Sequence, residues 1–285
     1  MRVEEALQYA SEYLAAHQLR SPREDAELLL ASILKCERAF LYAYPEGRLN
    51  SAQERLFHKW LGKRGEHYPL QYLRGTQEFF GREFSVREGV FIPRPETELL
   101  LETALDILRL RQEEELQVVD VGTGSGCVAI TLACEEPRAR VVAIDKSPVA
   151  LQTARHNAKL HRCQDRIQFY EGEGLRPIEG QRFRCHLVVS NPPYVSSLDK
   201  ESVDLSVSRY EPDEAVFSGE SGHEVYLALF HQAGGVLHPG GKLVVELGWG
   251  EADKVSRLAY ENGWELEGMR KDLADTDRCA IFELR

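Results

Sequence analysis

The chain has 285 residues, 43% of them hydrophobic, which is sufficient for one large core and a smaller second one. Its net charge of -11 argues against stable nucleic-acid binding, which relies on lysine and arginine to neutralise phosphates, and favours a protein partner. No segment has the apolar length of a membrane span, and charged residues stand where a secretory signal would need an apolar run, so a cytoplasmic protein without membrane association is expected.

Residues 1–75 are expected to form a small helical domain. Apolar residues recur over Val3–Leu14 with the 3.6-residue spacing of a helix. Ser21 and Ser51 each have a glutamate three residues later, the spacing of a capping box, which predicts two further helix starts. Three or four short helices on one core would make a bundle that carries no motif for chemistry.

A second domain, residues 76–285, is expected to begin with a hairpin linker. Between Thr76 and Ile92 the sequence is rich in aromatic and β-branched residues with glycines between them, a pattern typical of a hairpin. Pro93 and Pro95 then precede a leucine-rich helix, and strands and helices alternate from there onward. Such alternation predicts an α/β domain in which a parallel sheet is covered on both faces.

The first strand of this sheet, 117–121, is expected to lead into a glycine loop and then a helix over 127–134. The loop consists of five small residues, Gly122, Thr123, Gly124, Ser125 and Gly126. Glycines at alternate positions let a ligand approach the main chain, beside the free N–H groups of the helix start. The next strand, 140–144, leads to Asp145, about 20 residues after the loop, where a carboxylate can accept both hydroxyls of a ribose or cap the following helix.

The spacing of the glycines separates two classes of ligand. The dinucleotide fingerprint would place its third glycine at position 127, where this chain has Cys127, so a pyrophosphate is not expected. The pattern G-x-G-x-G after Asp120 and Val121 instead resembles the first motif of S-adenosylmethionine-dependent methyltransferases.

The tetrapeptide Asn191, Pro192, Pro193 and Tyr194 directly follows a predicted buried strand, 185–190. Two prolines in series remove backbone donors and hold the chain extended, so the Asn191 amide and the Pro192 carbonyl can project into a crevice. Together they make a socket for a planar NH2 group such as that of adenine, cytosine or a glutamine side chain, and Tyr194 offers a flat face to stack on it. An ordinary proline-rich strand exit is the structural alternative.

The remaining strands are expected at 167–170, 242–247, 264–270 and 279–284, the last two as an antiparallel finish to the sheet. The turn over 238–241 is expected to introduce the strand 242–247. The six cysteines form no C-x-x-C pair and have no companion histidine spacing, so neither a metal site nor a disulfide framework is predicted.

The ordered set of motifs resembles the release-factor glutamine methyltransferases over nearly the whole chain. The matching stretches are S-P-R-E-D-A-E-L-L-L from Ser21, F-I-P-R-P-E-T-E from Phe91, D-V-G-T-G-S-G from Asp120, S-N-P-P-Y from Ser190, R-Y-E-P from Arg209 and E-L-G-W from Glu246. This family methylates the side-chain amide of the glutamine in the Gly-Gly-Gln motif of peptide chain release factors. The resemblance implies a Rossmann-like S-adenosylmethionine-dependent methyltransferase sheet with a small N-terminal helical-bundle domain. An enzyme that must find a single glutamine on a large folded protein needs contacts remote from that glutamine, so residues 1–75 are expected to dock the release factor.

The resemblance also implies roles for individual residues. It assigns S-adenosylmethionine, which leaves as S-adenosylhomocysteine, to Gly122, Thr123, Gly124, Ser125, Gly126, Asp145, Glu173, Gly174 and Asn191. It assigns the substrate glutamine to Asn191, Pro192, Pro193 and Tyr194, with Asn191, Pro192 and Tyr194 as the catalytic residues. Relatives often have an aromatic residue near the adenine where this chain has Gly174, so Leu175 or a residue from elsewhere is expected to supply the apolar face.

The fate of the amide proton follows from what surrounds the tetrapeptide in the sequence. An amide nitrogen attacks an already activated sulfonium methyl, so no strong base is needed. No histidine or lysine stands beside the motif, so the proton is expected to leave to solvent, with Glu246 as a candidate to assist.

Three alternatives remain open at this level. An adenine-specific DNA methyltransferase would use the same socket on a flipped base, but the acidic charge and the lack of a target-recognition domain argue against it. Methylation of a glutamine in a ribosomal protein shares the catalytic motif, and only the N-terminal sequence favours release factors. A non-catalytic nucleotide-binding or assembly module would keep the fold without the reaction.

Overall fold

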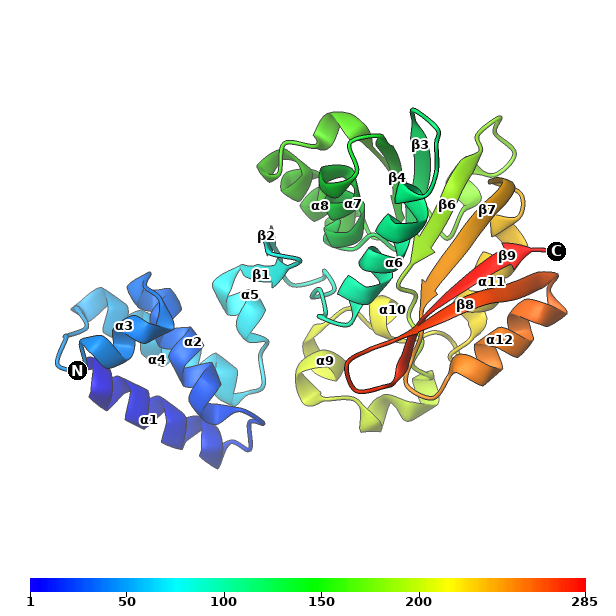
Figure 1. Ribbon diagram of the computed structural model, residues 1–285. Helices are drawn as coiled ribbons and strands as arrows, with labels where there is room; N and C mark the ends of the chain where they lie inside the picture. Colours follow the sequence, from blue (N-terminus) through cyan, green and yellow to red (C-terminus); the bar gives the residue numbers. More distant parts are fainter. The chain divides into compact units, whose positions relative to one another are not determined.

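The computed structural model describes residues 1–285, which divide into two compact units (Figure 1). The first unit consists of Met1–Thr76 together with Asp204–Tyr210. The second consists of Gln77–Val203 and Glu211–Arg285. The sequence pattern did not indicate that Asp204–Tyr210, a segment from the second half of the chain, would pack with the N-terminal helices.

The first unit is a bundle of helices around one apolar core. Its helices are α1 (Val3–Ala16), α2 (Pro22–Leu34), α3 (Arg38–Ala43), α4 (Ser51–Gly65), α5 (Leu70–Arg74) and, from the later segment, α9 (Leu205–Tyr210). The core includes Leu14, Leu29 and Phe57, all fully buried. Tyr210 ties α9 to the bundle, because its hydroxyl donates a hydrogen bond to the carbonyl of Glu66 over 2.9 Å.

Two helix starts in this unit differ from the predicted capping boxes. Helix α4 is capped by Asn50, one residue before Ser51, and its side chain accepts hydrogen bonds from the backbone N–H groups of Ala52 and Gln53. Ser21 does occupy the N-cap position of α2, but its side chain makes no capping hydrogen bond. Asparagine is as strong a cap as serine, so the local pattern alone does not separate adjacent candidates.

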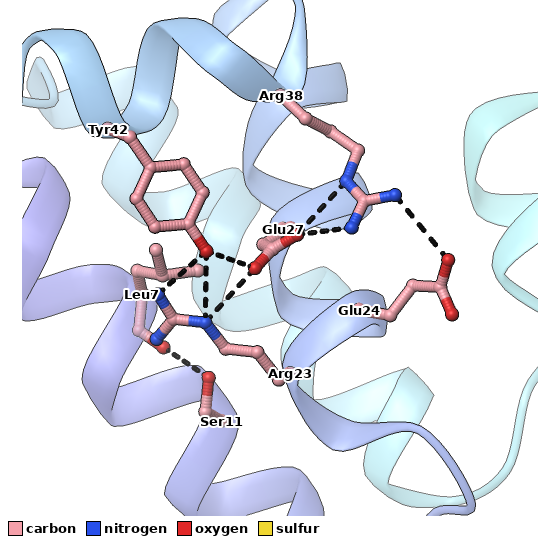
Figure 2. A network of polar contacts seen from close by, with 7 residues as sticks. All are labelled: Leu7, Ser11, Arg23, Glu24, Glu27, Arg38 and Tyr42. Carbon is pink, nitrogen blue, oxygen red and sulfur yellow. Dashed lines mark hydrogen bonds and ion pairs between the residues drawn. The ribbon is translucent and has the colours of Figure 1, made fainter.

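A buried carboxylate joins α2 to α3 (Figure 2). Glu27 is almost completely buried and accepts hydrogen bonds from Arg23 (3.1 Å), Arg38 (3.0 Å) and the hydroxyl of Tyr42. Burial acts to raise the pKa of Glu27, but the hydrogen bonds from Tyr42, Arg38 and Arg23 together outweigh it and hold the pKa below its ordinary value. The two helices therefore share one charge network.

The second unit is built on a seven-stranded sheet. A separate hairpin of β1 (Thr76–Phe79) and β2 (Arg82–Ser85) precedes it. The strands of the sheet are β3 (Leu116–Val121), β4 (Ala139–Asp145), β5 (Ile167–Glu171), β6 (Cys185–Ser190), β7 (Leu237–Glu246), β8 (Trp264–Lys271) and β9 (Asp277–Leu284). Their order is β5-β4-β3-β6-β7-β9-β8. The first five are parallel, and β9 runs antiparallel to both of its neighbours, which confirms the expected antiparallel finish.

Helices cover both faces of this sheet, as expected for an α/β domain. They are α6 (Thr97–Arg109), α7 (Cys127–Glu135), α8 (Pro148–Leu160), α11 (Glu224–Ala233) and α12 (Ala252–Glu261). The unit also contains the short helix α10 (Asp213–Val216). Three 3-10 helices complete the unit, η1 (Gln164–Arg166), η2 (Arg176–Ile178) and η3 (Ser197–Ser202).

Adjacent residues of each buried strand point to opposite cores. Val118 belongs to the core beneath α6 and α7, whereas Val119 belongs to the core beneath α11 and α12. Figure 1 shows α7 and α8 beside β4, and α12 beside β8. None of the helices is both long and apolar enough to cross a membrane.

Strand β7 begins earlier than predicted. It starts at Leu237 and includes the turn residues over 238–241, which were expected to precede it. Its pairing with β6 shifts register between Cys185 and Leu187, and this irregularity accommodates the Pro-Gly-Gly sequence inside the strand.

Candidate active site

The two main sequence motifs lie side by side at the carboxyl ends of β3 and β6. These strands are parallel neighbours in which Val121 pairs with Ser190, and the Ser190 hydroxyl donates a hydrogen bond to the Val121 carbonyl over 2.8 Å. The glycine loop follows Val121, and Asn191 follows Ser190. The strand order reverses between β3 and β6, and open α/β sheets bind ligands in the crevice at such a switch point.

One pocket at this position collects most of the predicted site residues. Its lining includes Gly122, Thr123, Gly124, Ser125, Asp145, Glu173, Gly174, Asn191, Pro192 and Pro193. Gly126 and Tyr194 are not among the lining residues. The lining also includes Phe91, Pro93 and Thr97, which sequence reasoning did not assign to the site. Their signal was present in the F-I-P-R-P-E-T-E stretch, which matched the family but was given no role in the site.

The three loop glycines serve different purposes. All have positive φ, 76° at Gly122, 56° at Gly124 and 83° at Gly126. A Cβ at Gly122 or Gly124 would meet nothing closer than a backbone atom at 4.0 Å, so this side of the loop is open to a ligand. A Cβ at Gly126 would lie 2.8 Å from Ile130 Cδ1 and 3.0 Å from Ala154 Cβ, so this glycine permits α7 to pack against α8.

Asp120 fixes the conformation of the glycine loop through hydrogen bonds. Its Oδ2 accepts hydrogen bonds from the Thr123 hydroxyl (2.7 Å) and from the N–H of Ala129 (3.2 Å). Complete burial raises the pKa of Asp120 to about 6. The proton of the Thr123 hydroxyl is therefore engaged by Asp120, while its oxygen can still accept a hydrogen bond from a ligand.

Asp145 is oriented by the backbone on both of its oxygens. Oδ2 accepts from the N–H of Gly124 (2.8 Å), and Oδ1 accepts from the N–H of Ser147 (2.9 Å). Burial raises the pKa of Asp145, and these two hydrogen bonds oppose the rise. Ser147, not Asp145, caps α8, because its hydroxyl accepts from the N–H of Ala150.

The Glu173–Gly174 pair lies at the rim of the pocket. The Glu173 side chain is exposed and pairs with Arg176 over 2.9 Å. Gly174 has φ 58°, and a Cβ there would lie 2.4 Å from Oε1 of Gln232, which accepts a hydrogen bond from the N–H of Leu175. Leu175 is fully buried in the core and does not line the pocket, so it does not supply the apolar face expected of it.

The Asn191 side chain is held by a residue 94 positions away in the sequence. Its Nδ2 donates a hydrogen bond to the hydroxyl oxygen of Thr97 over 2.9 Å. Thr97 is buried at the first turn of α6, and its hydroxyl lowers the pKa of the nearby Glu246 carboxylate. Burial raises the pKa of Glu246 to about 7, and its Oε2 has no hydrogen-bond partner.

Tyr194 packs against Gly248 and does not line the pocket. A Cβ at Gly248 would come within 2.9 Å of the Tyr194 ring, so the glycine of the E-L-G-W stretch makes room for the ring. Burial raises the pKa of Tyr194 to about 12, so its phenol stays neutral.

Glu211, the glutamate of the R-Y-E-P stretch, binds the segment before α6. It is buried, accepts a hydrogen bond from the N–H of Ile92 (3.1 Å) and forms an ion pair with Arg94. The preceding Tyr210 belongs to the first unit, and the following Pro212 lines the pocket. One short stretch therefore connects the helical unit, the segment before α6 and the pocket wall.

Both parts of the chain are similar to known protein families. Residues 5–75 match the family model of the PrmC N-terminal domain, and residues 84–207 match that of the methyltransferase small domain. The release factor glutamine methyltransferase of Koribacter versatilis is 42% identical over 282 residues, which cover 99% of this chain and 98% of that protein. The release factor glutamine methyltransferase of Coxiella burnetii is 37% identical over 262 residues, which cover 92% of each chain.

Solved structures show the same fold at low sequence identity. A methyltransferase from Pyrococcus furiosus superposes with a TM-score of 0.50 at 15% identity and covers 82% of this chain and 98% of its own. A SAM-dependent methyltransferase from Agrobacterium tumefaciens also has a TM-score of 0.50, at 13% identity, and covers 74% of this chain and 70% of its own. These likenesses confirm the predicted methyltransferase fold.

Proposed function

Because the chain belongs to the release factor glutamine methyltransferases, we propose that it transfers a methyl group from S-adenosylmethionine to the glutamine side-chain amide in the Gly-Gly-Gln motif of peptide chain release factors. The orientation of the Asn191 amide is the observation that supports the proposed reaction. The Asn191 amide lies beside the glycine loop with its NH2 turned to Thr97, which leaves its oxygen to accept a hydrogen bond from a substrate NH2 group.

The residues around the pocket fit S-adenosylmethionine. The ligand carries no pyrophosphate, and the loop offers an open main-chain surface at Gly122 and Gly124 for its methionine portion. Asp145 presents a backbone-oriented carboxylate for the ribose hydroxyls, and Glu173 lies at the rim for the adenine. When bound, the cofactor supplies a methyl group activated by a positively charged sulfur.

The substrate amide needs orientation more than activation. The nitrogen lone pair of an amide is delocalised into its carbonyl, so the chain must align the nitrogen with the methyl group. Asn191 Oδ1 and the Pro192 carbonyl each accept one N–H of the glutamine in this proposal, and they also favour the positive charge that grows on the nitrogen. No histidine lines the pocket and Tyr194 stays neutral, so the proton is released to solvent.

The helical unit has the features of a docking surface for the release factor. It contributes no residue to the pocket, yet it has a buried core of its own. Phe40 on α3 and Tyr44, the residue that follows this helix as its C-cap, are 42% and 53% exposed with their ring centroids 4.5 Å apart. Exposed aromatic side chains are typical anchors of protein interfaces. The hydroxyl of Tyr42, between them in sequence, is already engaged by Glu27.

A labelling experiment tests the substrate assignment. The purified chain, tritiated S-adenosylmethionine and cytosolic protein from a strain lacking the enzyme should give one labelled band at the size of a release factor. Purified release factor should be labelled, and the same factor with its Gly-Gly-Gln glutamine replaced by alanine should not. Label that survives this replacement, or label on duplex DNA or a ribosomal protein instead, would overturn the proposal.

A further inference from the structure

The direction of the Asn191 amide is decided by the groups behind it. An ionised carboxylate only accepts hydrogen bonds, so toward an ionised Glu246 the nearby hydroxyl of Thr97 presents its single proton. The Thr97 oxygen can then only accept from Asn191, and the amide turns its NH2 toward Thr97, where the distance is 2.9 Å. The Asn191 oxygen is left to the pocket side.

We infer that Thr97 and Glu246 are positioning residues for methyl transfer, which hold the Asn191 amide with its oxygen toward the substrate nitrogen. The inference rests on the proposed function for the identity of the substrate, but the amide orientation itself does not. If the amide were reversed, its NH2 would face the NH2 of the glutamine, and two donors would meet without an acceptor.

Glu246 acts through Thr97 rather than on the substrate. Thr97 and Asn191 line the pocket, whereas Glu246 does not. Its backbone is fixed by a hydrogen bond from the Tyr226 hydroxyl to its carbonyl over 2.7 Å. Glu246 is therefore held by its backbone near Thr97, and the Thr97 oxygen is the group that contacts Asn191.

Protonation of Glu246 would remove the constraint on Thr97. A neutral carboxyl can donate to the Thr97 oxygen, which frees the hydroxyl proton to point at Asn191 and permits the reversed amide. Burial raises the pKa of Glu246 to about 7; the Thr97 hydrogen bond opposes the rise, Glu96 adds to it, and Arg278 and Arg94 oppose it. Other titratable side chains that sense its charge are Tyr194, Tyr226, Cys127 and Cys279. Turnover should therefore rise with pH through about 7.

Substitutions at Thr97 test the effect of the hydroxyl separately from the effect of side-chain volume. Thr97→Val should lower kcat about 10- to 100-fold, less than the loss expected for a group in direct contact with the reacting atoms. Thr97→Ser, which keeps the hydroxyl, should restore kcat to within about threefold. Thr103 is a matched control on the same helix, because it is fully buried and its hydroxyl donates to the Leu99 carbonyl (2.7 Å); Thr103→Val should leave kcat unchanged.

Cofactor affinity must be measured with these variants, because Thr97 lines the pocket. The inference requires that kcat at saturating cofactor and release factor falls in Thr97→Val. If calorimetry shows weaker S-adenosylmethionine binding while saturated kcat is retained, Thr97 only binds cofactor and the positioning role is wrong. An equal loss in Thr97→Ser and Thr97→Val would also overturn it, since the hydroxyl would not matter.

A spectroscopic readout on the chain alone tests the relay without any substrate. The chain has only four asparagines, Asn50, Asn157, Asn191 and Asn262, so asparagine-selective 15N labelling gives four side-chain NH2 groups. The Asn191 signals are those absent from Asn191→Ala. Between about pH 5 and about pH 9 they should shift with the titration of Glu246, and the shift should vanish in Glu246→Gln.

The outcomes of this titration are decisive in either direction. Asn191 signals that do not respond to pH, or that respond equally in Glu246→Gln, would refute the relay. A normal Asn191 titration in a chain that fails to methylate release factors would count against the proposed function and leave the relay intact. In Glu246→Gln the rise of kcat with pH through about 7 should also be lost.

Discussion

The carboxylate of Asp145 is already oriented by hydrogen bonds before a ligand binds. Both of its oxygens accept a backbone N–H, so the carboxylate has a fixed direction, and each oxygen retains a lone pair for a further hydrogen bond. A hydrogen bond to a charged group contributes about 1.5 to 3 kcal/mol, so one fixed carboxylate can decide the affinity for a ribose.

Replacing Asp145 by alanine should weaken the binding of S-adenosylmethionine by at least about tenfold while the fold remains intact. Isothermal calorimetry measures the affinity, and circular dichroism checks the fold. Asp165→Ala, at an exposed position of η1 outside the pocket, serves as the control. Unchanged affinity in a folded Asp145→Ala variant would remove this residue from the site.

Asn191 should affect turnover far more than cofactor binding. Asn191→Ala removes the oxygen that is proposed to accept the glutamine N–H, and the loss of one preorganised polar contact costs roughly 100- to 1000-fold in kcat. Initial rates with saturating cofactor and release factor measure this loss, and calorimetry should show little change in S-adenosylmethionine affinity. Near-normal turnover would contradict the amide-socket mechanism.

At the scale of elements, Gly126 controls the packing of α7 against α8. Gly126→Ala adds a Cβ 3.0 Å from that of Ala154, at a position with φ 83°. Gly180 is a matched control with φ 71° and nothing within 4 Å of an added Cβ. Gly180→Ala should cost about 1 to 2 kcal/mol of stability from backbone strain alone.

Gly126→Ala should cost a further 1 to 3 kcal/mol, roughly, because the two helices must separate to admit the methyl group. Urea denaturation of both variants measures the difference. Equal destabilisation at the two positions would mean that the backbone angle, and not helix packing, accounts for glycine at position 126.

The Glu27 network predicts how the α2–α3 pair responds to acid. The folded-state pKa of Glu27 lies below its ordinary value of 4.5, so its contribution to stability is complete above pH 4.5 and is lost as pH falls through the folded-state pKa. Glu27→Gln should therefore lower the free energy of unfolding at neutral pH and flatten its decline in acid, measured by urea denaturation at several pH values.

Glu24 provides the comparison for this acid response. It pairs with the same Arg38 over 3.4 Å but is 56% exposed, and such surface pairs contribute little to stability. Glu24→Gln should leave the acid profile close to that of the unaltered chain. If Glu24→Gln and Glu27→Gln gave the same profile, burial of Glu27 would not be the cause.

At the scale of the whole molecule, deletion of the N-terminal helices would also disturb a helix from the second half of the chain. Helix α9 packs with the N-terminal helices although it lies in the second half of the sequence, so deletion of residues 1–75 would remove its packing partners, including the carbonyl of Glu66 that binds Tyr210. Substitutions on the surface of α3 are therefore a sharper test of docking than a shortened chain.

The double variant Phe40→Ala with Tyr44→Ala should raise KM for intact release factor by about tenfold or more, because truncation of aromatic anchors typically costs above 1 kcal/mol each. KM for a short Gly-Gly-Gln peptide should not change, since the peptide lacks the remote surface. Leu110→Ala, at an exposed apolar residue of the second unit, is the control. An unchanged KM for the intact factor would place the docking surface elsewhere.

Much of the architecture was determined by local sequence. The strands β3 to β6, β8 and β9 lie within a residue or two of their predicted positions, because apolar runs bounded by turn residues have few other structures open to them. The glycine loop and the N-P-P-Y tetrapeptide were recognisable for the same reason: their conformations depend on residues adjacent in the chain. Local sequence was less informative where neighbouring candidates had equal propensity, as at Ser51 and Asn50.

Only the tertiary structure decided which side chains meet behind those motifs. The contact of Thr97 with Asn191, the position of Glu246 beyond it and the membership of α9 in the first unit join residues far apart in the sequence. The same holds for Gln232, which occupies the space that a side chain at Gly174 would need. A hydrogen bond of this kind requires two elements to lie at a set distance and angle, and no periodicity within either element encodes their relative placement.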